Sequence, residues 1–487
     1  MVTRSLTLSL TIDESSNKVL FAEVGKDFID VLFSFLTLPL GTLVRISDKN
    51  SIPCLDNLYK SVEDLAGEYF KTAPCKEMLL GPRHAAEIMC LDLWVNLEGN
   101  RALCYYTCSR DCRYDYLSLY ENAQCDCGCK MSHKVYLPSG SMKNENSEGV
   151  FLKGGRYFIT DSFSVVPSSI QAAFNLLGGD RKIMSTLMER QVTVGISEVI
   201  SILKQSLVSE AALTNVFLVK ESVNLPEKKN RALAHYSRPE LCSDSDSSDG
   251  IVSIKLSVDK QKNKVVFAEC KEDFIDFLFS FLTYPSGFVI EKLNGISHVP
   301  CLDNLYASVL RNTMADCFEA TNTKEYLVNP MIPSHFSLNQ SLIESEEVHR
   351  EWKRYYLCRN PDCDSTKVSL IPNMGCKCGC ITNKRMKIMD PWSGANGDFS
   401  KGFVSDGTYI VTDDLVITPL CSVSTLMRRI VIDDLVEVPF NIGKREALAL
   451  LEAALTGSLA VLTNVFLSKV EKIEDATSGI DGDCVLV

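Results

Sequence analysis

Ten of the twenty cysteines lie in two short windows whose spacing is typical of a metal site. The first window, YYTCSRDCRYDYLSLYENAQCDCGCK, begins at residue 105, and the second, YYLCRNPDCDSTKVSLIPNMGCKCGC, begins at residue 355. Each reads as a cysteine pair, a twelve-residue spacer and a Cys-x-Cys-Gly-Cys motif. Two cysteine pairs on a short hairpin supply the four soft ligands that zinc binds as a tetrahedron. The windows therefore predict two structural zinc sites.

We predict four zinc ligands among the five cysteines of each window. A glycine after Cys127 and after Cys378 lets the backbone turn and direct amide groups at a thiolate sulfur, which favours these cysteines as ligands. The predicted ligands are Cys108, Cys112, Cys125, Cys127, Cys358, Cys363, Cys376 and Cys378. One residue between the cysteines of a pair is tighter spacing than usual, so Cys129 and Cys380 stay open as alternative ligands. The competing interpretation is that these cysteines are unligated thiols packed in a core. If zinc is bound, each four-thiolate site would contribute on the order of 10 kcal/mol to the free energy of folding.

Charge and hydropathy indicate which class of partner and which cellular compartment to expect for this protein. The 487 residues include 50 Lys plus Arg and 62 Asp plus Glu, so the net charge is 50 − 62 = −12, which disfavours nucleic acid as a partner. No secretory signal pattern is present near residue 1. The longest apolar stretch, 28–44, is broken by Asp30 and Pro39 and is too short for a membrane helix. We expect a soluble protein of the cytoplasm or nucleus without membrane contact, in which reduced cysteines bind metal.

Two repeated pairs of side chains are weaker candidates for chemistry. Cys54 and Cys301, both in PCLDNLY, could act as nucleophiles, but the six histidines do not occupy matching places that would supply a base. Asp161 and Asp413, in ITDS and VTDD, could form an acidic site, but Thr-Asp before a strand is typical of turn or cap chemistry. We predict structural roles for all four and no catalytic residue. The basic segment NKRMK at 383–387 could contact phosphate, but we favour a solvated face.

The sequence segments that must form the elements around these residues occur twice in the chain. LSLTIDESSNKVLFAEVGKDFIDVLFSFLTLP returns as IKLSVDKQKNKVVFAECKEDFIDFLFSFLTYP, and the segments PCLDNLY and TNVFL also recur in the same order. Because the order is kept, we predict a duplicated domain rather than a short solenoid repeat. The expected division is a first repeat at 1–220 with a zinc-ribbon-like insert at 104–137, an acidic Ser/Asp-rich linker at 221–250, a second repeat at 251–470 with an insert at 355–389, and a disordered tail at 471–487.

Periodicity predicts strands and helices in both repeats. Apolar residues alternate with polar ones at 6–12 and at 252–258, and each run is followed by turn residues and a second apolar run, which predicts a β-hairpin. Near the end of each repeat, apolar residues spaced three or four positions apart predict a helix whose apolar face covers the core. These residues are Ile200, Leu203, Leu207, Leu448, Leu451 and Leu455.

A buried helix should follow each hairpin. Asp27 and Asp273 are expected as N-caps of apolar helices that Pro39 and Pro285 end. Hairpins and helices without βαβ alternation predict the α+β class. The predicted fold is thus two tandem copies of one α+β domain, each with a β-hairpin, buried helices and a zinc-ribbon-like hairpin of four cysteines.

Several segments resemble one known family. VLFAEVGKDFIDVLFSFLTLPLG, PCLDNLY, the CxxxC to CxCG window, VTDDLVITP and LTNVFL are similar to those of the plant proteins catalogued as domain of unknown function family 674. The resemblance covers both repeats, nearly the whole chain except the linker and the tail. It implies a plant source and no catalytic residue, because the family has no assigned activity. The family pattern keeps Cys-x-Cys-Gly and varies the next position, which agrees with Cys129 and Cys380 as extra cysteines. The first repeat has Ser162 where the second has Asp414, which argues against a shared two-carboxylate site.

Three functions follow as expectations. We favour a non-catalytic, zinc-stabilised module that binds a protein partner, because the metal pattern is structural and no catalytic constellation is recognisable. Nucleic-acid binding through the zinc-ribbon-like hairpins is the second, and it predicts a steep salt dependence. An enzyme that uses the paired carboxylates or Cys54 and Cys301 is the third, and it requires a shared pocket with perturbed pKa values.

Overall fold

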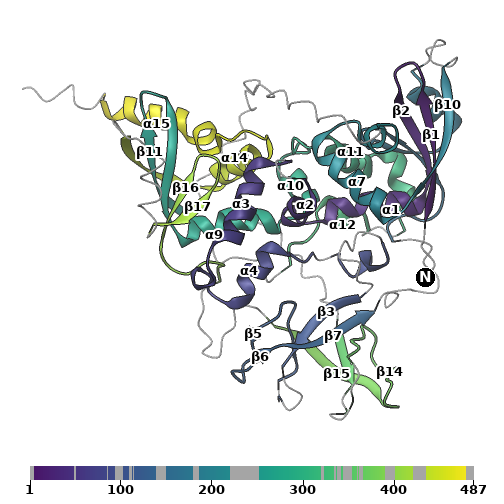
Figure 1. Ribbon diagram of the computed structural model, residues 1–487, viewed down its shortest axis with the longest axis horizontal. Coiled ribbons are helices and arrows are strands. Elements are labelled where there is room, and N and C mark those ends of the chain that lie inside the picture. Colours follow the sequence, from purple (N-terminus) through teal and green to yellow (C-terminus); the bar gives the residue numbers. More distant parts are fainter. Residues whose placement is uncertain are drawn as a thin grey trace, which may run out of the picture.

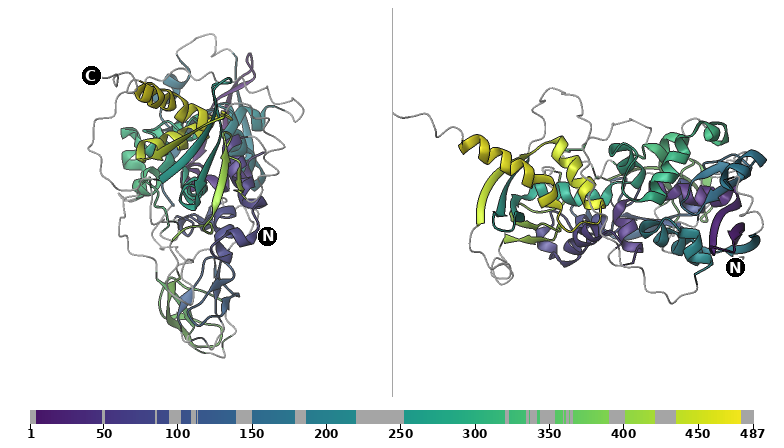
Figure 2. Two further views of the ribbon diagram at one scale, coloured as in Figure 1. Left: turned by 90° about the vertical axis from the view of Figure 1, so that its left-hand side faces the viewer. Right: turned by 90° about the horizontal axis from the view of Figure 1, so that it is seen from above.

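The computed structural model forms an elongated body with a smaller unit attached to one side (Figures 1 and 2). It describes residues 5–48, 51–84, 86–93, 102–108, 112, 114–138, 150–178, 186–219, 252–319, 323–333, 336, 342–343, 354–358, 360, 363, 366–389, 401–420 and 435–478. The linker expected at 221–250 and residues 479–487 lie outside the described residues.

A five-stranded antiparallel sheet lies at one end of the body in the order β10-β1-β2-β8-β9 (Figure 1). Its strands are β1 (Leu6–Asp13), β2 (Lys18–Gly25), β8 (Arg156–Thr160), β9 (Val165–Pro167) and β10 (Leu187–Val194). The apolar residues of β1 face the core, and Leu8 and Leu10 are fully buried. Asn17 takes a φ of 49° in the turn after β1, a left-handed conformation that asparagine tolerates. The hairpin predicted from alternation is confirmed.

A second five-stranded antiparallel sheet lies at the opposite end in the order β17-β16-β12-β11-β18 (Figure 1). Its strands are β11 (Val252–Asp259), β12 (Lys264–Lys271), β16 (Thr408–Thr412), β17 (Ile417–Pro419) and β18 (Leu435–Ile442). Starting from β18, this order corresponds strand for strand to the order of the first sheet that starts from β10. Asn263, with a φ of 50°, occupies the place of Asn17.

The helices after the two hairpins meet at the centre of the body. They are α1 (Lys26–Ser34), η1 (Phe35–Thr37), α2 (Leu40–Ile46), α9 (Glu272–Ser280), η4 (Phe281–Thr283) and α10 (Ser286–Lys292). The Leu40 N–H donates to the Tyr284 carbonyl and the Ser286 N–H donates to the Leu38 carbonyl, both at 2.9 Å. A Cβ at Gly41 would lie 2.9 Å from the Leu282 carbonyl oxygen, so this contact requires glycine.

These helices are buried as predicted, but their N-caps were predicted wrongly. The N-cap positions are Gly25 and Lys271, and neither side chain caps the helix. Asp27 and Asp273 instead lie in the first helical turn, where a negative charge interacts favourably with the helix dipole and stabilises the helix. Leu38, before Pro39, is extended and ends η1, as expected of a residue before proline.

Two helices are exchanged between the halves, and they contain the PCLDNLY segments: α3 (Pro53–Asp64) and α11 (Pro300–Leu310). Asn57 of α3 donates through Nδ2 to the Asp414 carbonyl at 2.8 Å, beside the second sheet. Asn304 of α11 donates in the same way to the Ser162 carbonyl at 2.9 Å, beside the first sheet. Each sheet is therefore completed by a helix from the other half, and one continuous hydrophobic core runs through both.

The remaining helices cover the sheets and the central helices. They are η2 (Gly67–Tyr69), α4 (Ala73–Leu80), η3 (Met89–Asp92), α5 (Ile170–Leu176), α7 (Ile196–Val208), α8 (Ala212–Phe217), η5 (Asn312–Cys317), α12 (Thr323–Val328), α14 (Lys444–Leu455) and α15 (Val461–Ser478). In α7 and α14 the predicted stripe is buried at Leu203, Leu207, Leu451 and Leu455, while Ile200 and Leu448 are half-buried. Helix α15 runs into the segment where we expected a disordered tail. None of the described helices has both the length and the apolar character needed to cross a bilayer.

The cysteine windows fold together into the smaller unit, which we call the Cys module (Figure 1). Its first hairpin (102–138) and second hairpin (355–389) contain β3 (Ala102–Thr107), β4 (Tyr116–Leu117), β5 (Ala123–Gln124), β6 (Lys130–Met131), β7 (His133–Pro138), β13 (Tyr355–Cys358), β14 (Met374–Gly375) and β15 (Ile381–Ile388). The Lys387 N–H donates to the Asp115 carbonyl at 2.8 Å, and the Tyr136 N–H donates to the Thr366 carbonyl at 2.6 Å. The mixed α+β class is confirmed.

Candidate metal centres

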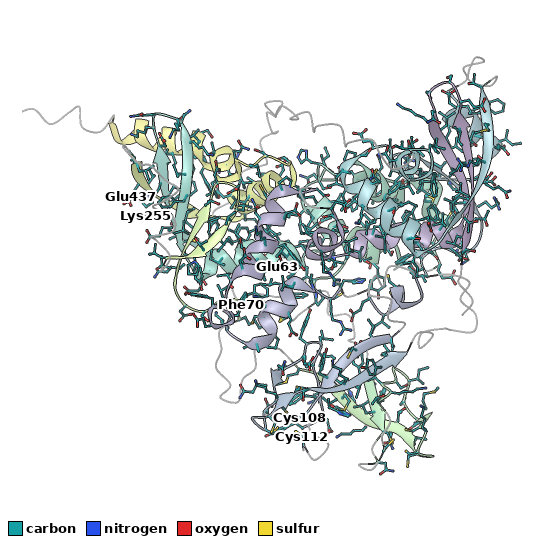
Figure 3. The ribbon with its side chains drawn as sticks, viewed as in Figure 1. Glu63, Phe70, Cys108, Cys112, Lys255 and Glu437 are labelled. Atoms are coloured by element: carbon teal, nitrogen blue, oxygen red, sulfur yellow. The ribbon has the colours of Figure 1, made fainter. Side chains whose placement is uncertain are left out.

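The first cysteine cluster brings together Cys108, Cys112, Cys125 and Cys127 of the first hairpin. Their four sulfur atoms lie within 4.8 Å of one another. The sulfurs of Cys108 and Cys127 are 3.3 Å apart, and those of Cys112 and Cys125 are 3.6 Å apart. Cys108 follows β3 and Cys125 follows β5, so strand ends position one member of each cysteine pair. Figure 3 shows Cys108 and Cys112 at the end of the Cys module farthest from the body.

The second cysteine cluster brings together Cys358, Cys363, Cys376 and Cys378 of the second hairpin, again within 4.8 Å. The sulfurs of Cys358 and Cys378 are 3.5 Å apart, and those of Cys363 and Cys376 are 3.3 Å apart. The pairing of first with fourth and second with third cysteine is the same in both clusters. The structure thus brings together each of the two ligand sets predicted from spacing.

The donor type and the distances fit a tetrahedral thiolate site. With Zn–S bonds of about 2.3 Å, the edge of a regular tetrahedron is about 3.8 Å, close to the short sulfur–sulfur distances and below the 4.8 Å limit. A disulfide requires sulfurs about 2.05 Å apart, and all eight cysteines are free thiols. Each cluster could hold one metal ion, and four thiolates favour zinc.

The glycine in each Cys-Gly-Cys motif explains why the fifth cysteine is not a member of either cluster. Gly128 and Gly379 have φ values of 86° and 82°, a left-handed conformation that glycine adopts without strain. This turn lets the Cys129 N–H donate to the Cys127 sulfur, which lowers the pKa of Cys127 to about 6. The N–H of Cys380 lowers the pKa of Cys378 in the same way. The fifth cysteines contribute a backbone donor, while their own side chains are exposed.

The two clusters differ in exposure. Cys108 is 5% exposed and Cys125 is fully buried, because Ala123, Met131 and Met389 pack around them. None of the four cysteines of the second cluster is buried, and Cys378 is exposed. The second cluster is therefore more accessible to solvent than the first.

The two hairpins share a small hydrophobic core of their own. Leu117, Val135 and Leu137 of the first hairpin pack with Val368 and Met386 of the second. The rings of Tyr105 and Tyr355 add a contact at 5.2 Å between centroids. The strand pairs and this core make the Cys module one unit built from both halves of the chain.

A buried arginine attaches the Cys module to the body, and sequence reasoning missed it. The Arg83 guanidinium binds the Glu87 carboxylate through Nε and Nη2 at 2.6–3.0 Å. Its Nη1 donates to the Cys104 carbonyl at 2.7 Å, and its cation lies 4.7 Å from the Tyr105 ring centroid. Burial opposes the charge, but Glu87 outweighs it and raises the pKa of Arg83. A single arginine without a motif gives no sequence signal for this contact.

The thiols of Cys54 and Cys301 are fully buried, as predicted. They donate to the carbonyls of Ser458 at 2.9 Å and Ser209 at 3.2 Å, respectively. Burial, with added repulsion from nearby aspartates, raises the pKa of Cys54 to about 12 and also raises that of Cys301. A raised pKa disfavours the nucleophilic thiolate, so both cysteines support the exchanged helices α3 and α11.

The carboxylates of Asp161 and Asp413 bind helix starts, as turn and cap chemistry predicted. Asp161 accepts from the Thr214 N–H at 2.9 Å and from its hydroxyl at 2.6 Å, at the start of α8. Asp413 accepts the same two bonds from Thr463 at 2.8 and 2.7 Å, at the start of α15. These bonds occupy both oxygens of each carboxylate and hold the helix against its sheet.

Two further buried carboxylates occupy the recurring DFID segments, and sequence analysis did not single them out. Asp30 accepts from the backbone N–H groups of 150–152 at 3.0–3.2 Å, and Asp276 accepts from those of Phe403 and Val404 at 2.7 and 2.9 Å. Burial raises the pKa of Asp30 to about 6 and that of Asp276 to about 7, although the N–H donors oppose the shift. An acidic residue in an otherwise apolar helix, present in both halves, was the available signal.

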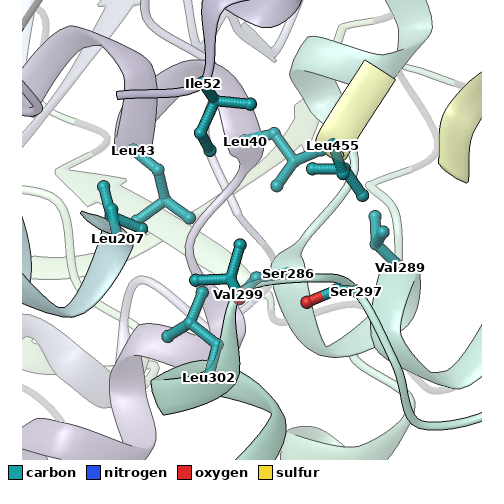
Figure 4. A pocket seen from close by; sticks show the side chains of 10 residues that line it. All are labelled: Leu40, Leu43, Ile52, Leu207, Ser286, Val289, Ser297, Val299, Leu302 and Leu455. Carbon is teal, nitrogen blue, oxygen red and sulfur yellow. The ribbon is translucent and has the colours of Figure 1, made fainter. Parts of the chain in front are cut away.

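A small cavity lies where the two halves meet (Figure 4). Its lining is mostly Leu, Ile and Val, with Ser286 and Ser297 as the polar members. Both serine hydroxyls are already bonded, to the Phe35 carbonyl and to Asp303. No lining group is free to recognise a ligand, so we interpret the cavity as packing space.

Comparison with known proteins identifies one family. The family model described as "Protein of unknown function (DUF674)" matches residues 3–430 and residues 353–482. No curated protein and no solved structure matches the chain.

Proposed function

The chain belongs to the DUF674 family, and since that description names no activity, we propose a function from the contacts of the chain itself: a non-catalytic protein that binds other proteins through a zinc-stabilised Cys module. The carrying observation is that two four-thiolate clusters with the same sulfur pairing flank one shared core. Bound zinc would fix the ends of both hairpins, because an isolated two-stranded hairpin is only marginally stable in water.

A tandem duplication is the second part of the proposal. The equal strand order of the two sheets, the recurring asparagine turns and the reciprocal exchange of α3 and α11 support it. The boundaries at 220, 250 and 470, the plant source and the location in cytoplasm or nucleus stay predictions.

The contacts of the other candidate residues favour binding over catalysis. Cys54 and Cys301 are buried thiols with raised pKa values. Asp161 and Asp413 are fully bonded to helix starts. An enzyme would need at least one of these groups poised in a pocket with a base or acid beside it.

The test compares partner capture by matched full-length proteins. Chemical crosslinking and mass spectrometry should find partner peptides joined to the Cys module of the wild-type chain. A Cys112→Ser, Cys363→Ser double variant, which removes one ligand of each cluster, should lose these crosslinks, whereas a Cys129→Ser, Cys380→Ser variant should keep them. Crosslinks that persist in the ligand variant would contradict a function of the zinc-stabilised module.

A further inference from the structure

The Cys-Gly-Cys motif of the second cluster places a fifth thiol beside the four proposed zinc ligands. Residues 376–380 form the turn between β14 and β15. The Cys376 N–H donates to the Cys380 carbonyl at 2.7 Å, and the Gly379 N–H donates to the Cys376 carbonyl at 3.0 Å. These bonds hold Cys380 against the cluster, although it is not one of the four members. A thiol that lies next to a metal site without being a ligand is available for chemistry of its own.

Cys380 contacts the proposed ligand Cys378 directly. Its N–H donates to the Cys378 sulfur, and a hydrogen bond also joins the two side chains. The Cα atoms of residues i and i+2 lie at most about 7 Å apart, and the left-handed φ of 82° at Gly379 bends the chain between these two. A disulfide joins Cα atoms that are about 4.4–6.8 Å apart. The two cysteines are therefore within reach of a disulfide.

Both sulfurs of this pair are accessible to small solutes. The side chains of Cys378 and Cys380 are exposed. A Cβ built on Gly379 would meet no atom of the described residues within 4 Å, so the backbone between the two cysteines is open as well. Figure 1 shows β14, which precedes this turn, at the edge of the Cys module away from the body. A solvent-accessible thiolate next to a second, resolving cysteine is typical of a redox sensor.

The first cluster has the same motif but a better protected set of ligands. Its Cys127 and Cys129 are exposed as well, but Cys108 is 5% exposed and Cys125 is fully buried. After the loss of one ligand, the first cluster would keep two sulfurs that solvent barely reaches. In the second cluster, all three remaining ligands are only half-buried. Zinc should therefore leave the second cluster first when one of its thiolates is oxidised.

We propose that Cys378 and Cys380 form a reversible thiol–disulfide switch, which releases zinc from the second cluster when hydrogen peroxide oxidises it. The Cys378 thiolate attacks one oxygen of the peroxide, the O–O bond breaks and hydroxide leaves, which gives a sulfenic acid. The Cys380 thiol then attacks this sulfur, so that a disulfide forms and water leaves. Two electrons pass from the two sulfurs to the peroxide, and the second cluster, left with three thiolates, loses its zinc. A dithiol such as dithiothreitol restores both thiols by exchange. The proposal rests on the zinc-stabilised module of the proposed function and adds its regulation.

The resolving thiol decides whether the oxidation can be reversed. A sulfenic acid that meets no thiol is oxidised further to a sulfinic acid, which thiols do not reduce. A Cys380→Ser variant keeps the backbone N–H that donates to Cys378 but lacks the resolving thiol. This variant should bind zinc like the wild type and lose it irreversibly in peroxide. Cys129→Ser, the equivalent change in the first hairpin, is the matched control.

The test treats the zinc-loaded full-length proteins with a small molar excess of hydrogen peroxide. A chromogenic chelator measures the released zinc, and mass spectrometry after alkylation measures the state of the cysteines. Tryptic cleavage after Lys377 and Lys384 gives a peptide whose only cysteines are Cys378 and Cys380. In the wild type and in Cys129→Ser, this peptide should become two hydrogen atoms lighter and resist alkylation as the first zinc ion is released.

Reduction with dithiothreitol and addition of zinc should then restore nearly all of this zinc in the wild type and in Cys129→Ser. Cys380→Ser should regain roughly fivefold less and carry a sulfinic acid at Cys378. Zinc release without this disulfide, or full recovery of zinc by Cys380→Ser, would overturn the proposal. A disulfide that forms first in the tryptic peptide 114–130 of the first hairpin would contradict the choice of the second cluster. Untreated wild-type protein without zinc would instead refute the metal centres of the proposed function, whereas two zinc ions that persist in peroxide would refute only this switch.

Discussion

Replacement of Arg83 by methionine should detach the first hairpin from the body. The side chains of Arg83 and Glu87 are 14% and 15% exposed and form a bidentate pair. Removal of one partner of a buried pair leaves an uncompensated charge and typically costs about 3–5 kcal/mol. The loss of the bond to the Cys104 carbonyl acts in the same direction.

Hydrogen exchange with mass spectrometry measures this opening locally, which suits a large chain that need not unfold in one step. A cost of about 3 kcal/mol corresponds to exchange roughly 100-fold faster in amides of the first hairpin, such as Tyr106, which donates to the Ser118 carbonyl at 2.8 Å. Amides of α1, which is buried in the main core, should exchange at the wild-type rate.

A double-mutant cycle separates the ion pair from packing. Glu87→Met should also accelerate exchange, and Arg83→Met with Glu87→Met should cost about 2 kcal/mol less than the sum of the single variants, because no buried charge is left unpaired. Additive effects, or an Arg83→Met variant with exchange within threefold of the wild type, would refute the role assigned to this pair.

Three further predictions concern the clusters, the buried carboxylates and the exchanged helices. With excess EDTA, zinc should leave in two phases, and the fast phase should disappear in Cys358→Ser because the second cluster is more exposed; a single phase would contradict the difference in exposure. The pKa of Asp276 is about 7 in the folded chain and 3.8 in the unfolded chain. Between these two pH values the folded chain binds more protons than the unfolded chain. The free energy of unfolding should therefore fall as the pH rises from about 4 to about 7, by up to about 4 kcal/mol. Asp276→Asn, whose retained Oδ1 can accept both backbone bonds, should flatten this fall in urea midpoints measured across pH, and an unchanged pH profile would count against it. Cleavage at a protease site introduced within 221–250 should leave the two halves in one peak on size-exclusion chromatography, because α3 and α11 are exchanged; separate peaks without denaturant would exclude the exchange.

The elements that local patterns specify were predictable from the sequence. Alternation at 6–12 located β1, and the apolar run after Asp27 located α1, because burial imposes those periods. The cysteine spacing was also sufficient to predict which four cysteines come together in each cluster, since all four members of a cluster lie on one hairpin. Whether Cys129 is a member of the first cluster depends on the backbone conformation of Gly128, which cannot be read from the cysteine spacing.

The long-range features were not predictable from one sequence. The exchange of α3 between halves depends on contacts such as Asn57 with Asp414, which are separated by 357 residues. The pairing of Lys387 with Tyr116, which joins the two hairpins, likewise has no local signal. Helix α1 begins at Lys26 rather than after Asp27, because the chain passes directly from β2, which ends at Gly25, into the helix.

Zinc content tests the central claim most directly. Purified full-length protein should contain two zinc atoms per chain, Cys108→Ser and Cys358→Ser should each contain one, and the double variant should contain none, while Cys129→Ser with Cys380→Ser should keep two. Undiminished zinc in the Cys108→Ser, Cys358→Ser double variant, or no zinc in the wild-type protein, would contradict the assignment of the two cysteine clusters as metal centres.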